Sequence, residues 1–465
     1  MINIKSETIQ QQESVIKTKE TFFVISGIAD IDIASNQSMK NTLKHLSSFG
    51  YCIHVFAAFP KNYPILQNPE EVFNSNVIFH RSPNFLIPVF NFAKKVKDFF
   101  GRADKKKDQA PKKLDPNNKT SYYDEYNFFG RMFFAFFLFI YVPIELIRVL
   151  FYFGRLKPKL FYGINDQGSA VCSILGKFLK IPVIHRWHGV SHTEEDVAKM
   201  KTSFKHKLLL LDGSFARMMH NDALVVTNDG TRGDEIFPLM GIDPKKIYYW
   251  RNGFDVDELY LENDWNAEEF KKSLGIEGKK IALTASRLVL WKRVDRALES
   301  LHRLITQYEI KDMVLLIVGN GREEIRLKQI AKDLNIEEHV KFLGSVPHCD
   351  MAKYYSIADM FLSFYEISNL GNPLIEAMYF GLPIVTLRDS GSIQLVEDGA
   401  NGFMLEAETL DQEAPKKMQL LLSDETLREK MGNRSKQIFD EKMLSWKDRM
   451  AKEDDLIQKL ILKYQ

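Results

Sequence analysis

Short apolar runs alternate with amphipathic helical patterns along most of the chain, and this alternation strongly limits the fold. The run TFFVISG at 21–27 is followed by a helical pattern at 39–50 and by a second apolar run at 51–59. A strand, a helix and a strand in this order predict parallel pairing, because parallel strands need a crossover connection. The sequence therefore predicts an α/β fold with parallel sheets.

Two such series follow one another, which predicts two Rossmann-like halves. The expected strands of the first series also include 77–81, 160–165, 181–187 and 223–228. Those of the second are 281–286, 313–319, 340–344, 360–364 and 383–387, with helices beginning near 294, 323, 350 and 373. The 465 residues suit two to three domains. We expect a flexible leader at 1–20, domains at 21–254 and 255–445, and a last helix at 446–465.

Composition narrows the class of protein. A hydrophobic share of 45% and a charged share of 27% exclude collagen-like and disordered chains. The 63 basic and 61 acidic residues nearly balance, which gives no indication of nucleic-acid binding. Cys52, Cys172 and Cys349 are too scattered for a disulfide framework or a zinc site, so we expect a reducing, cytoplasmic compartment. The polar start lacks the apolar segment of a secretory signal.

Two cations follow the first strand of the second series, in TASRLVLWKRVD. Ligands of open parallel sheets bind at the carboxyl ends of the strands. Arg287 and Lys292 are therefore candidates to clamp a diphosphate, Arg287 in bidentate fashion and Lys292 as a point charge. The alternative is that both are solvated loop cations.

Two further loops of this half have features of phosphate or nucleotide sites. Gly319 and Gly321 follow a strand and precede a helix, where glycine allows close approach of a nucleotide, although a simple tight turn fits equally. Residues 369–372 precede Pro373, which suits the first position of a helix. Amides there would point at an anion, and Glu376 lies one turn into the helix. A structural Glu in a first helical turn is the alternative.

These loops make the chain resemble the retaining glycosyltransferases of family 4, which have the GT-B fold. The motifs are SRLVLWKRVD, VGNG, VKFLGSVP, NLGNPLIEAMYFGLPIV and EDGANGFML, together with the interdomain segment RNGFDVDEL at 251–259. The resemblance is strong over 223–405 and continues in layout over 21–222. It implies two Rossmann-like domains facing a central donor cleft, with the acceptor on the first domain. It also implies that the last helix returns to the first domain.

The resemblance implies a role for each matching residue. Arg287 and Lys292 would hold the donor diphosphate and stabilise the leaving charge. Glu376 matches the second Glu of the family's pair, which binds the ribose, and the amides of Leu370 and Gly371 would bind phosphate. The other implied donor-binding positions are Gly27, Gly319, Gly321, Leu343, Ser345 and Asn369.

The chain departs from the family at the first Glu of the pair, which normally recognises the sugar hydroxyls. Counting back from Glu376 gives Ser368, and the nearest carboxylate is Glu366. Either the loop bulges so that Glu366 serves the sugar, as a candidate catalytic residue, or Ser368 replaces the glutamate. We favour a changed but working site, because Arg287, Lys292 and Glu376 are all present.

The first half supplies the expected acceptor side. Its first loop matches the family's glycine loop only through Gly27. Asn36 and Gln37 are candidates to face the diphosphate. The alternative is that Ser35 or Asn36 caps a helix. His188, in HRWHGV, resembles the family's His that faces the donor sugar, and a core His is the alternative. His185 would point the opposite way. Asn165 and Asp166 end a strand and are candidate acceptor contacts.

An unusually aromatic stretch lies at 128–153 and follows a basic segment at 94–113. Glu145 and Arg148 argue against a spanning helix, because each charge is costly inside a bilayer. The resemblance places a soluble helix at 141–153, which leaves 128–140 as an extra aromatic stretch. We expect 94–140 to be an insertion that contacts a membrane surface. The alternative is that these Phe side chains pack into the core.

The expected function is transfer of a sugar from a nucleotide diphosphate to a glycan or lipid-linked acceptor, at the cytoplasmic face of the cell membrane. The resemblance implies a front-face displacement that keeps the anomeric configuration and needs no protein nucleophile, metal or further cofactor. The nucleotide sugar is then a co-substrate. Two alternatives stay open: a GT-B sugar-nucleotide epimerase, and an inactive GT-B scaffold motivated by the displaced glutamate.

Overall fold

The computed structural model describes most of both halves. The described residues are 20–28, 37–58, 73, 75–81, 128–190, 194, 197–198, 201, 216, 218–256 and 259–465, with the backbone alone at 27–28, 37, 58, 81 and 128–139. The expected leader at 1–20, apart from Glu20, and the basic segment at 94–113 lie outside this set.

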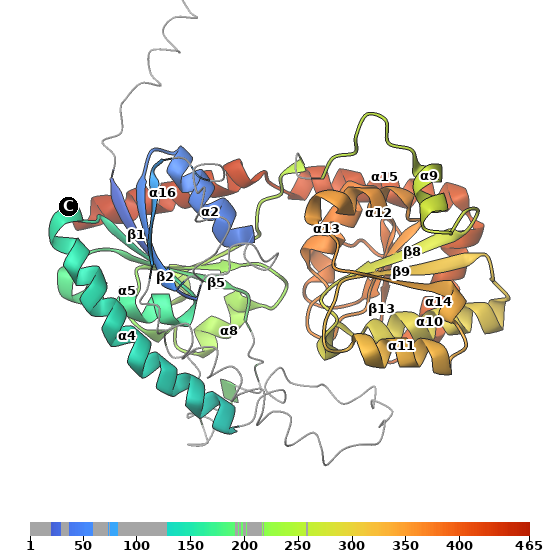
Figure 1. Ribbon diagram of the computed structural model, residues 1–465, viewed down its shortest axis with the longest axis horizontal. Coiled ribbons are helices and arrows are strands. Elements are labelled where there is room, and N and C mark those ends of the chain that lie inside the picture. Colours follow the sequence, from blue (N-terminus) through green and yellow to red (C-terminus); the bar gives the residue numbers. More distant parts are fainter. Residues whose placement is uncertain are drawn as a thin grey trace, which may run out of the picture.

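The described chain forms two parallel sheets, one in each half (Figure 1). The first has seven strands in the order β3-β2-β1-β4-β5-β6-β7. Their bounds are β1 Thr21–Ile28, β2 Cys52–Ala58, β3 Val77–Arg81, β4 Leu160–Ile164, β5 Val183–His188, β6 Ala223–Thr227 and β7 Ile247–Trp250. The second has six, in the order β10-β9-β8-β11-β12-β13. Their bounds are β8 Lys280–Ala285, β9 Met313–Val318, β10 Val340–Gly344, β11 Met360–Ser363, β12 Ile384–Leu387 and β13 Gly402–Leu405.

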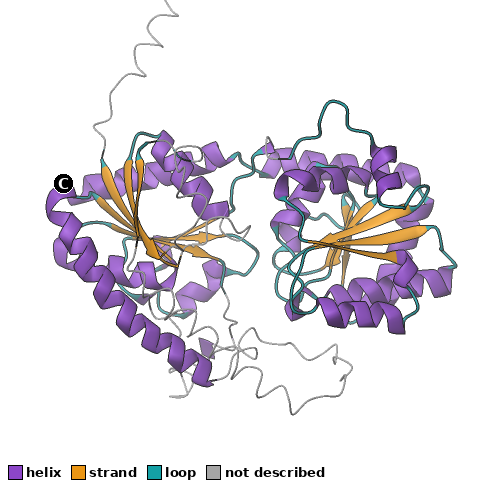
Figure 2. Ribbon diagram, viewed as in Figure 1, coloured by secondary structure: helices purple, strands orange, loops and turns teal. Residues whose placement is uncertain are grey.

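Helices cover both faces of the first sheet (Figure 2). One face carries α2 (Gln37–Ser48) and α16 (Trp446–Tyr464), and the other carries α4 (Phe128–Leu156) and α5 (Asn165–Leu179). Phe22 packs toward α2 and α16, whereas Phe23 packs toward α4 and α5, because successive side chains of a strand point to opposite faces. The short helix α8 (Gly233–Leu239) joins a smaller core beside β6 and β7.

The second sheet is covered in the same way, with a buried core on each face. One face carries α10 (Val294–Tyr308), α11 (Glu324–Asp333) and α14 (Leu410–Ser423). The other carries α9 (Ala267–Ser273), α12 (Met351–Ile357), α13 (Asn372–Tyr379) and α15 (Glu425–Lys442). The central strand β9 is fully buried, which explains its unbroken apolar sequence MVLLIV.

The last helix crosses from the second half to the first, and Figure 1 shows α16 lying along the first sheet. Arg186 on β5, Arg449 and Glu453 on α16, and Tyr162 on β4 meet there in the interior. The Arg449 Nη1 lies 2.8 Å from Glu453 Oε2, and the Tyr162 hydroxyl donates to Glu453 Oε1. This polar cluster joins the end of the chain to the first sheet.

The sequence predictions for strands match the structure closely, with two omissions. The strands β7 and β13 were not expected; every residue of β7 is partly exposed, and β13 begins with Gly402, so neither has the sequence of a buried parallel strand. The separation of 128–140 from a helix at 141–153 is wrong, because α4 is one helix of 29 residues that contains Pro143. Glu145 within it is buried and pairs with Arg148 at 2.9 Å.

Candidate functional site

The candidate site lies where the connections of the second sheet diverge. Strand β8 is flanked by β9 and β11, and α10, which follows β8, packs on one face. Helix α13, which follows β11, packs on the other face. The carboxyl ends of β8 and β11 therefore open a crevice at a topological switch point, where ligands of such sheets bind.

Lys292 projects into this crevice from the loop after β8. Its Nζ lies 3.6 Å from the centroid of the Tyr365 ring and 4.3 Å from that of Trp291, so two aromatic faces attract the ammonium group. The Tyr365 hydroxyl donates to the carbonyl of Ala285 at 2.9 Å, which fixes the ring at the end of β8. The exposed guanidinium of Arg287 lies over the same Trp291 ring at 5.9 Å. The two predicted cations thus share one aromatic platform.

Lys292 has few compensating charges in this place. Burial and the neighbouring Arg287 lower the pKa of Lys292 to about 7, while Asp229 and Asp389 act in the opposite direction. A lysine whose pKa is this low is only partly charged at neutral pH, and a bound anion would favour its charged form. The site is therefore prepared electrostatically for a ligand with negative charge.

Asp229 reaches this site from the first half, in the loop after β6. Its Oδ1 accepts hydrogen bonds from the Thr231 amide at 3.2 Å and hydroxyl at 2.6 Å. A Cβ added to Gly189 would lie 2.7 Å from the same oxygen, so the carboxylate packs against the backbone next to His188. Burial raises the pKa of Asp229. The carboxylate therefore lies between the His188 segment and the cations of the second half.

The two halves touch at this loop. The Ser368 hydroxyl donates to the carbonyl of Asp229, and the Ser390 hydroxyl donates to that of Gly230 at 2.8 Å. An added Cβ at Gly230 would lie 2.6 Å from Gly391 Cα, so only glycine fits this contact. The halves are thus held together directly beside the candidate site.

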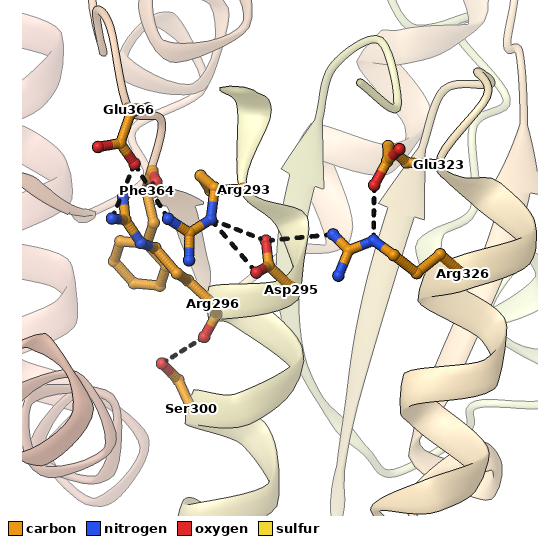
Figure 3. A network of polar contacts seen from close by, with 8 residues as sticks. All are labelled: Arg293, Asp295, Arg296, Ser300, Glu323, Arg326, Phe364 and Glu366. Carbon is orange, nitrogen blue, oxygen red and sulfur yellow. Dashed lines mark hydrogen bonds and ion pairs between the residues drawn. The ribbon is translucent and has the colours of Figure 1, made fainter. Parts of the chain in front are cut away.

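Glu366 lies in a network of ion pairs, shown in Figure 3. Its Oε2 accepts from Arg293 at 3.0 Å and from Arg296 at 2.9 Å, and Arg293 in turn bonds Asp295 at 3.2 Å. The first-Glu position of the family is occupied by Ser368, whose hydroxyl bonds across to the first half. Glu366 is thus held beside α10, and Ser368 instead contacts the backbone carbonyl of Asp229.

Glu376 is buried in the first turns of α13. Its Oε1 lies 3.1 Å from Nε2 of His348, and its Oε2 accepts from the Tyr355 hydroxyl at 2.8 Å. His348 is partly exposed and lies in the loop after β10, so Glu376 connects the helix to the expected nucleotide side of the site. Leu343 is half-buried near the end of β10, and Ser345 is exposed directly after this strand.

The loop before α13 uses two of its amides internally. The Asn369 amide donates to Asp389 at 2.9 Å, and the Leu370 amide donates to the Ser368 hydroxyl at 3.2 Å. Gly371 caps the helix in extended conformation, and an added Cβ there would meet only Pro373. Of the two amides that we expected to bind phosphate, that of Leu370 is engaged, and that of Gly371 donates no hydrogen bond to the part of the chain that the structure describes.

Close packing of two loops explains the two glycines after β9, and the sequence did not indicate this packing. An added Cβ at Gly319 would overlap the carbonyl oxygen of Ser286, and one at Gly321 would lie 2.7 Å from the carbonyl carbon of Leu288. The glycines thus let the loops after β8 and β9 pack together. They position the segment that carries Arg287 and Lys292.

Replacing Gly319 by Ala is expected to destabilise the protein by more than about 1 kcal/mol, because the backbone has a φ of +127° and the added atom overlaps Ser286. Urea unfolding would measure this loss. Gly278→Ala is the matched control, since Gly278 also has a positive φ but has no atom within 4 Å of an added Cβ. Equal losses in the two variants would show that backbone strain alone matters.

The predicted residues of the first half are only partly brought to the site. His188 ends β5 and is exposed, and surrounding protein together with Arg186 lowers its pKa to about 3, so its ring is neutral. His185 is buried against the Ser173 hydroxyl at 2.9 Å, which confirms that it points away. Asn165, with a φ of +62°, and Asp166 begin α5 and are half-buried.

The first-loop candidates are described in part. Gly27 lies within β1, and Gln37 is the first residue of α2. Ser35 and Asn36 lie outside the described residues, as do all residues from 29 to 36.

Three residues of the site were not predicted from the sequence: Asp229, Tyr365 and Asp389. Asp389 accepts from the amides of Asn369, Gly391 and Ser392 and so holds the loop before α13. All three follow the carboxyl end of a strand, β6, β11 or β12, and this shared position was the signal that could have identified them.

None of the three cysteines, all of which the structure describes, forms a disulfide. None of the described helices is long and apolar enough to cross a membrane. Among the described residues, no group of three or more His, Cys, Asp or Glu is placed to hold a metal ion.

Comparison with known proteins agrees with this geometry. Residues 266–438 match the model of the family Glycosyl transferases group 1, and this range contains Arg287, Lys292 and Glu376. The chain is 30% identical over 207 residues to the N-acetyl-alpha-D-glucosaminyl L-malate synthase of Bacillus anthracis, covering 44% of this chain and 52% of that protein. It is 28% identical over 202 residues to a GDP-mannose-dependent alpha-(1-6)-phosphatidylinositol monomannoside mannosyltransferase of Mycolicibacterium smegmatis, covering 42% and 52%. The chain thus spans about half the length of these curated relatives.

Solved structures share the whole fold. Sucrose-phosphate synthase from Thermosynechococcus elongatus matches with a TM-score of 0.66 at 16% identity, over 96% of this chain and 100% of that one. The Anabaena protein HepE, solved in complex with UDP, matches with a TM-score of 0.63 at 15% identity, over 93% and 99%. These likenesses confirm the expected GT-B fold of two Rossmann-like domains.

Proposed function

We propose that the protein is a retaining glycosyltransferase of family 4, which moves a sugar from a nucleotide-diphosphate sugar to a glycan or lipid-linked acceptor. The observation that carries this proposal is the position of Lys292. It lies at the switch point of the second sheet, beside Arg287 and between two aromatic rings, within the range that matches the group 1 glycosyl transferase model. Such a site suits a diphosphate leaving group.

In the proposed reaction, the bond between the anomeric carbon and the diphosphate oxygen breaks while the acceptor oxygen attacks from the same face. The acceptor proton passes to the leaving phosphate oxygen, so no protein nucleophile or metal is required. Lys292 and Arg287 stabilise the negative charge that develops on the diphosphate. Burial has lowered the pKa of Lys292, and the bound diphosphate would raise it again.

We place the donor sugar between His188, Asp229 and Lys292. Ser368 stands where the family has its first Glu, and its hydroxyl is engaged by the Asp229 carbonyl. The Asp229 carboxylate lies beside the His188 segment and attracts Lys292, which makes it the best-placed acceptor for sugar hydroxyls. The neutral ring of His188 adds a hydrogen-bonding group without adding charge.

On this proposal, Glu376 orients the ribose together with His348. Changing Glu376 to Gln is expected to weaken nucleoside diphosphate binding about tenfold or more, since hydrogen bonds to a charged acceptor are lost. Calorimetric titration would measure the affinity. Tyr355→Phe is the control, because it removes the internal bond at 2.8 Å and keeps the carboxylate. An unchanged affinity in a folded Glu376→Gln protein would contradict the assignment.

The experiment that tests the proposed function is a panel of nucleotide sugars read by thermal shift. A ligand that binds only the native state raises the apparent stability, so the true donor would identify itself. We expect one nucleotide class to raise the melting temperature and its sugar conjugate to raise it further. A panel in which no nucleotide sugar or nucleoside diphosphate stabilises the protein would contradict the proposal.

We also propose that the protein acts as a peripheral protein at the cytoplasmic membrane face, which would suit a lipid-linked acceptor. The segment 94–140 was expected to make this contact. Its residues 94–127 lie outside the described part of the chain, and 128–139 are described only as the helical start of α4. The support for this proposal is the basic and aromatic sequence of the segment.

A further inference from the structure

The outer face of α4 is apolar where a helix facing water normally carries polar residues. The side chains that face the core include Tyr141, Glu145 and Val149, all fully buried. The exposed positions that follow Tyr141 in α4 are Pro143, Ile147, Leu150, Phe151, Gly154 and Arg155, and of these only Arg155, in the last turn of the helix, has a polar side chain. Ile147 is 72% exposed and Phe151 is 69% exposed, so these large side chains lie in the solvent. The helix is therefore apolar on both its inner and its outer face.

The one charged pair in this part of α4 does not interrupt the apolar outer face. Arg148 donates to both oxygens of Glu145, at 3.0 and 2.9 Å. Its guanidinium also lies 5.5 Å from the centroid of the Phe56 ring on β2, which turns it toward the sheet. The opposite charges of Glu145 and Arg148 thus compensate each other on the side of α4 that faces the sheet.

Helix α5 extends the same surface. It packs against α4 in one shared core that includes Val149 and Leu175. At the end of α5, Phe178 is 79% exposed. We call the four side chains Ile147, Leu150, Phe151 and Phe178 the α4–α5 patch.

Basic residues flank the α4–α5 patch along the chain. Five exposed basic residues come from the ends of the two helices and from the connection to β4: Arg155, Lys157, Lys159, Lys177 and Lys180. The sequence contains no Asp or Glu in 146–164 or in 167–181. Exposed aromatic and aliphatic side chains bordered by lysine and arginine are typical of helices that lie in a membrane interface.

We propose that the α4–α5 patch docks on the surface of an anionic lipid bilayer, with α4 lying in the plane of the interface. The apolar side chains enter the boundary between headgroups and acyl chains, and the five cations bind the anionic headgroups. This surface follows the 94–140 segment along the chain and is built from other side chains. The proposed docking does not depend on whether the protein transfers sugars.

Charge favours a bilayer over a second copy of the chain. In a symmetric dimer through this patch, the same surface would face itself, so the five cations would lie opposite one another. No carboxylate in these stretches could separate them. An anionic bilayer instead offers a negative charge to each cation, and the attraction weakens as salt screens it.

The test is sedimentation of the full-length protein with vesicles of phosphatidylcholine, with or without phosphatidylglycerol. The wild type should bind the anionic vesicles, and less at high salt. The variant Ile147→Ser/Phe151→Ser/Phe178→Ser should lose about tenfold or more of this binding. The control is Ile325→Ser, which removes a side chain that is 85% exposed on α11 of the other domain, and it should bind as the wild type does.

Unchanged vesicle binding by the triple variant would overturn the proposal. It would also be overturned if the wild type were a dimer in solution, the triple variant a monomer, and neither bound vesicles. A cooperative thermal unfolding transition and an unchanged circular dichroism spectrum for each variant verify that the fold is intact. Because vesicle binding needs no turnover, a failure of this proposal is distinguishable from a failure of the proposed transferase function.

Discussion

Replacing Lys292 by Met is expected to lower the rate of sugar transfer about a hundredfold or more while leaving the protein folded. The ammonium group is one of the two cations proposed to stabilise the leaving diphosphate, and removing one preorganised group of this kind typically has an effect of this size. The Met side chain would still pack between the rings of Tyr365 and Trp291, which Lys292 Nζ contacts at 3.6 and 4.3 Å. A steady-state transfer assay with the donor identified by the panel would measure the loss.

The same residue predicts a pH dependence. Since the pKa of Lys292 is lowered to about 7, the free protein loses this positive charge as the pH rises through 7. The affinity for a diphosphate should therefore be highest below pH 7 and fall above it, with proton uptake when the ligand binds. Lys292→Arg, which stays charged, should bind with a flatter pH profile. Identical profiles for the wild type and this variant would contradict the role of Lys292.

Replacing Glu453 by Ala is expected to destabilise the protein by about 3–5 kcal/mol, because removing one partner of a buried ion pair leaves an uncompensated charge. Arg186, Arg449 and Glu453 are each no more than 1% exposed, so the two arginines would share the interior without a carboxylate. Urea unfolding of the full chain would measure the loss. Asp455→Ala is the matched control, since Asp455 is exposed on the same helix and its loss should be within about 0.5 kcal/mol.

The buried carboxylate also fixes the sign of a pH effect on stability. Burial alone would raise the pKa of Glu453, but Arg449 and Arg186 hold it below its usual value. The contribution of Glu453 to the free energy of unfolding is therefore fully present above the pKa that this group has in the unfolded chain. It is lost as the pH falls through the lower pKa of the folded protein. The wild type should therefore lose more stability than Glu453→Ala on acidification. A loss under about 1 kcal/mol in Glu453→Ala would show that α16 is held by its apolar contacts alone.

The sequence predicted the fold well because both sheets are parallel and buried. Buried strands such as β9 are continuous apolar runs, and the helices between them keep a clear amphipathic pattern. Strand β7 is partly exposed throughout and β13 begins with a glycine, so neither stands out as a buried apolar run. The unity of α4 was missed because the family resemblance placed a separate helix at 141–153, whereas α4 runs from Phe128 to Leu156. Glu145 is accommodated inside it by its ion pair with Arg148.

The position of the candidate site along the sheet could be predicted from local sequence. Lys292 and Arg287 follow β8 and Glu376 follows β11, so all three come after the carboxyl ends of neighbouring strands. The position of Asp229 could not be predicted, because its contacts with Ser368 and with the Gly189 backbone join segments far apart along the chain. Similarly, Gly319 has no room for a side chain because the carbonyl of Ser286 lies beside it. This contact arises only when the two loops pack together, so the sequence does not reveal it.

The central claim is that the cleft between the two domains transfers a sugar. The most direct measurement follows the donor found by the panel, and compares the nucleoside diphosphate released with the labelled sugar incorporated into glycan and lipid acceptor fractions. We predict equal amounts of the two products in the wild type and loss of both in Lys292→Met. Free epimerised nucleotide sugar without incorporation, or donor binding with no turnover in any acceptor fraction, would contradict the claim.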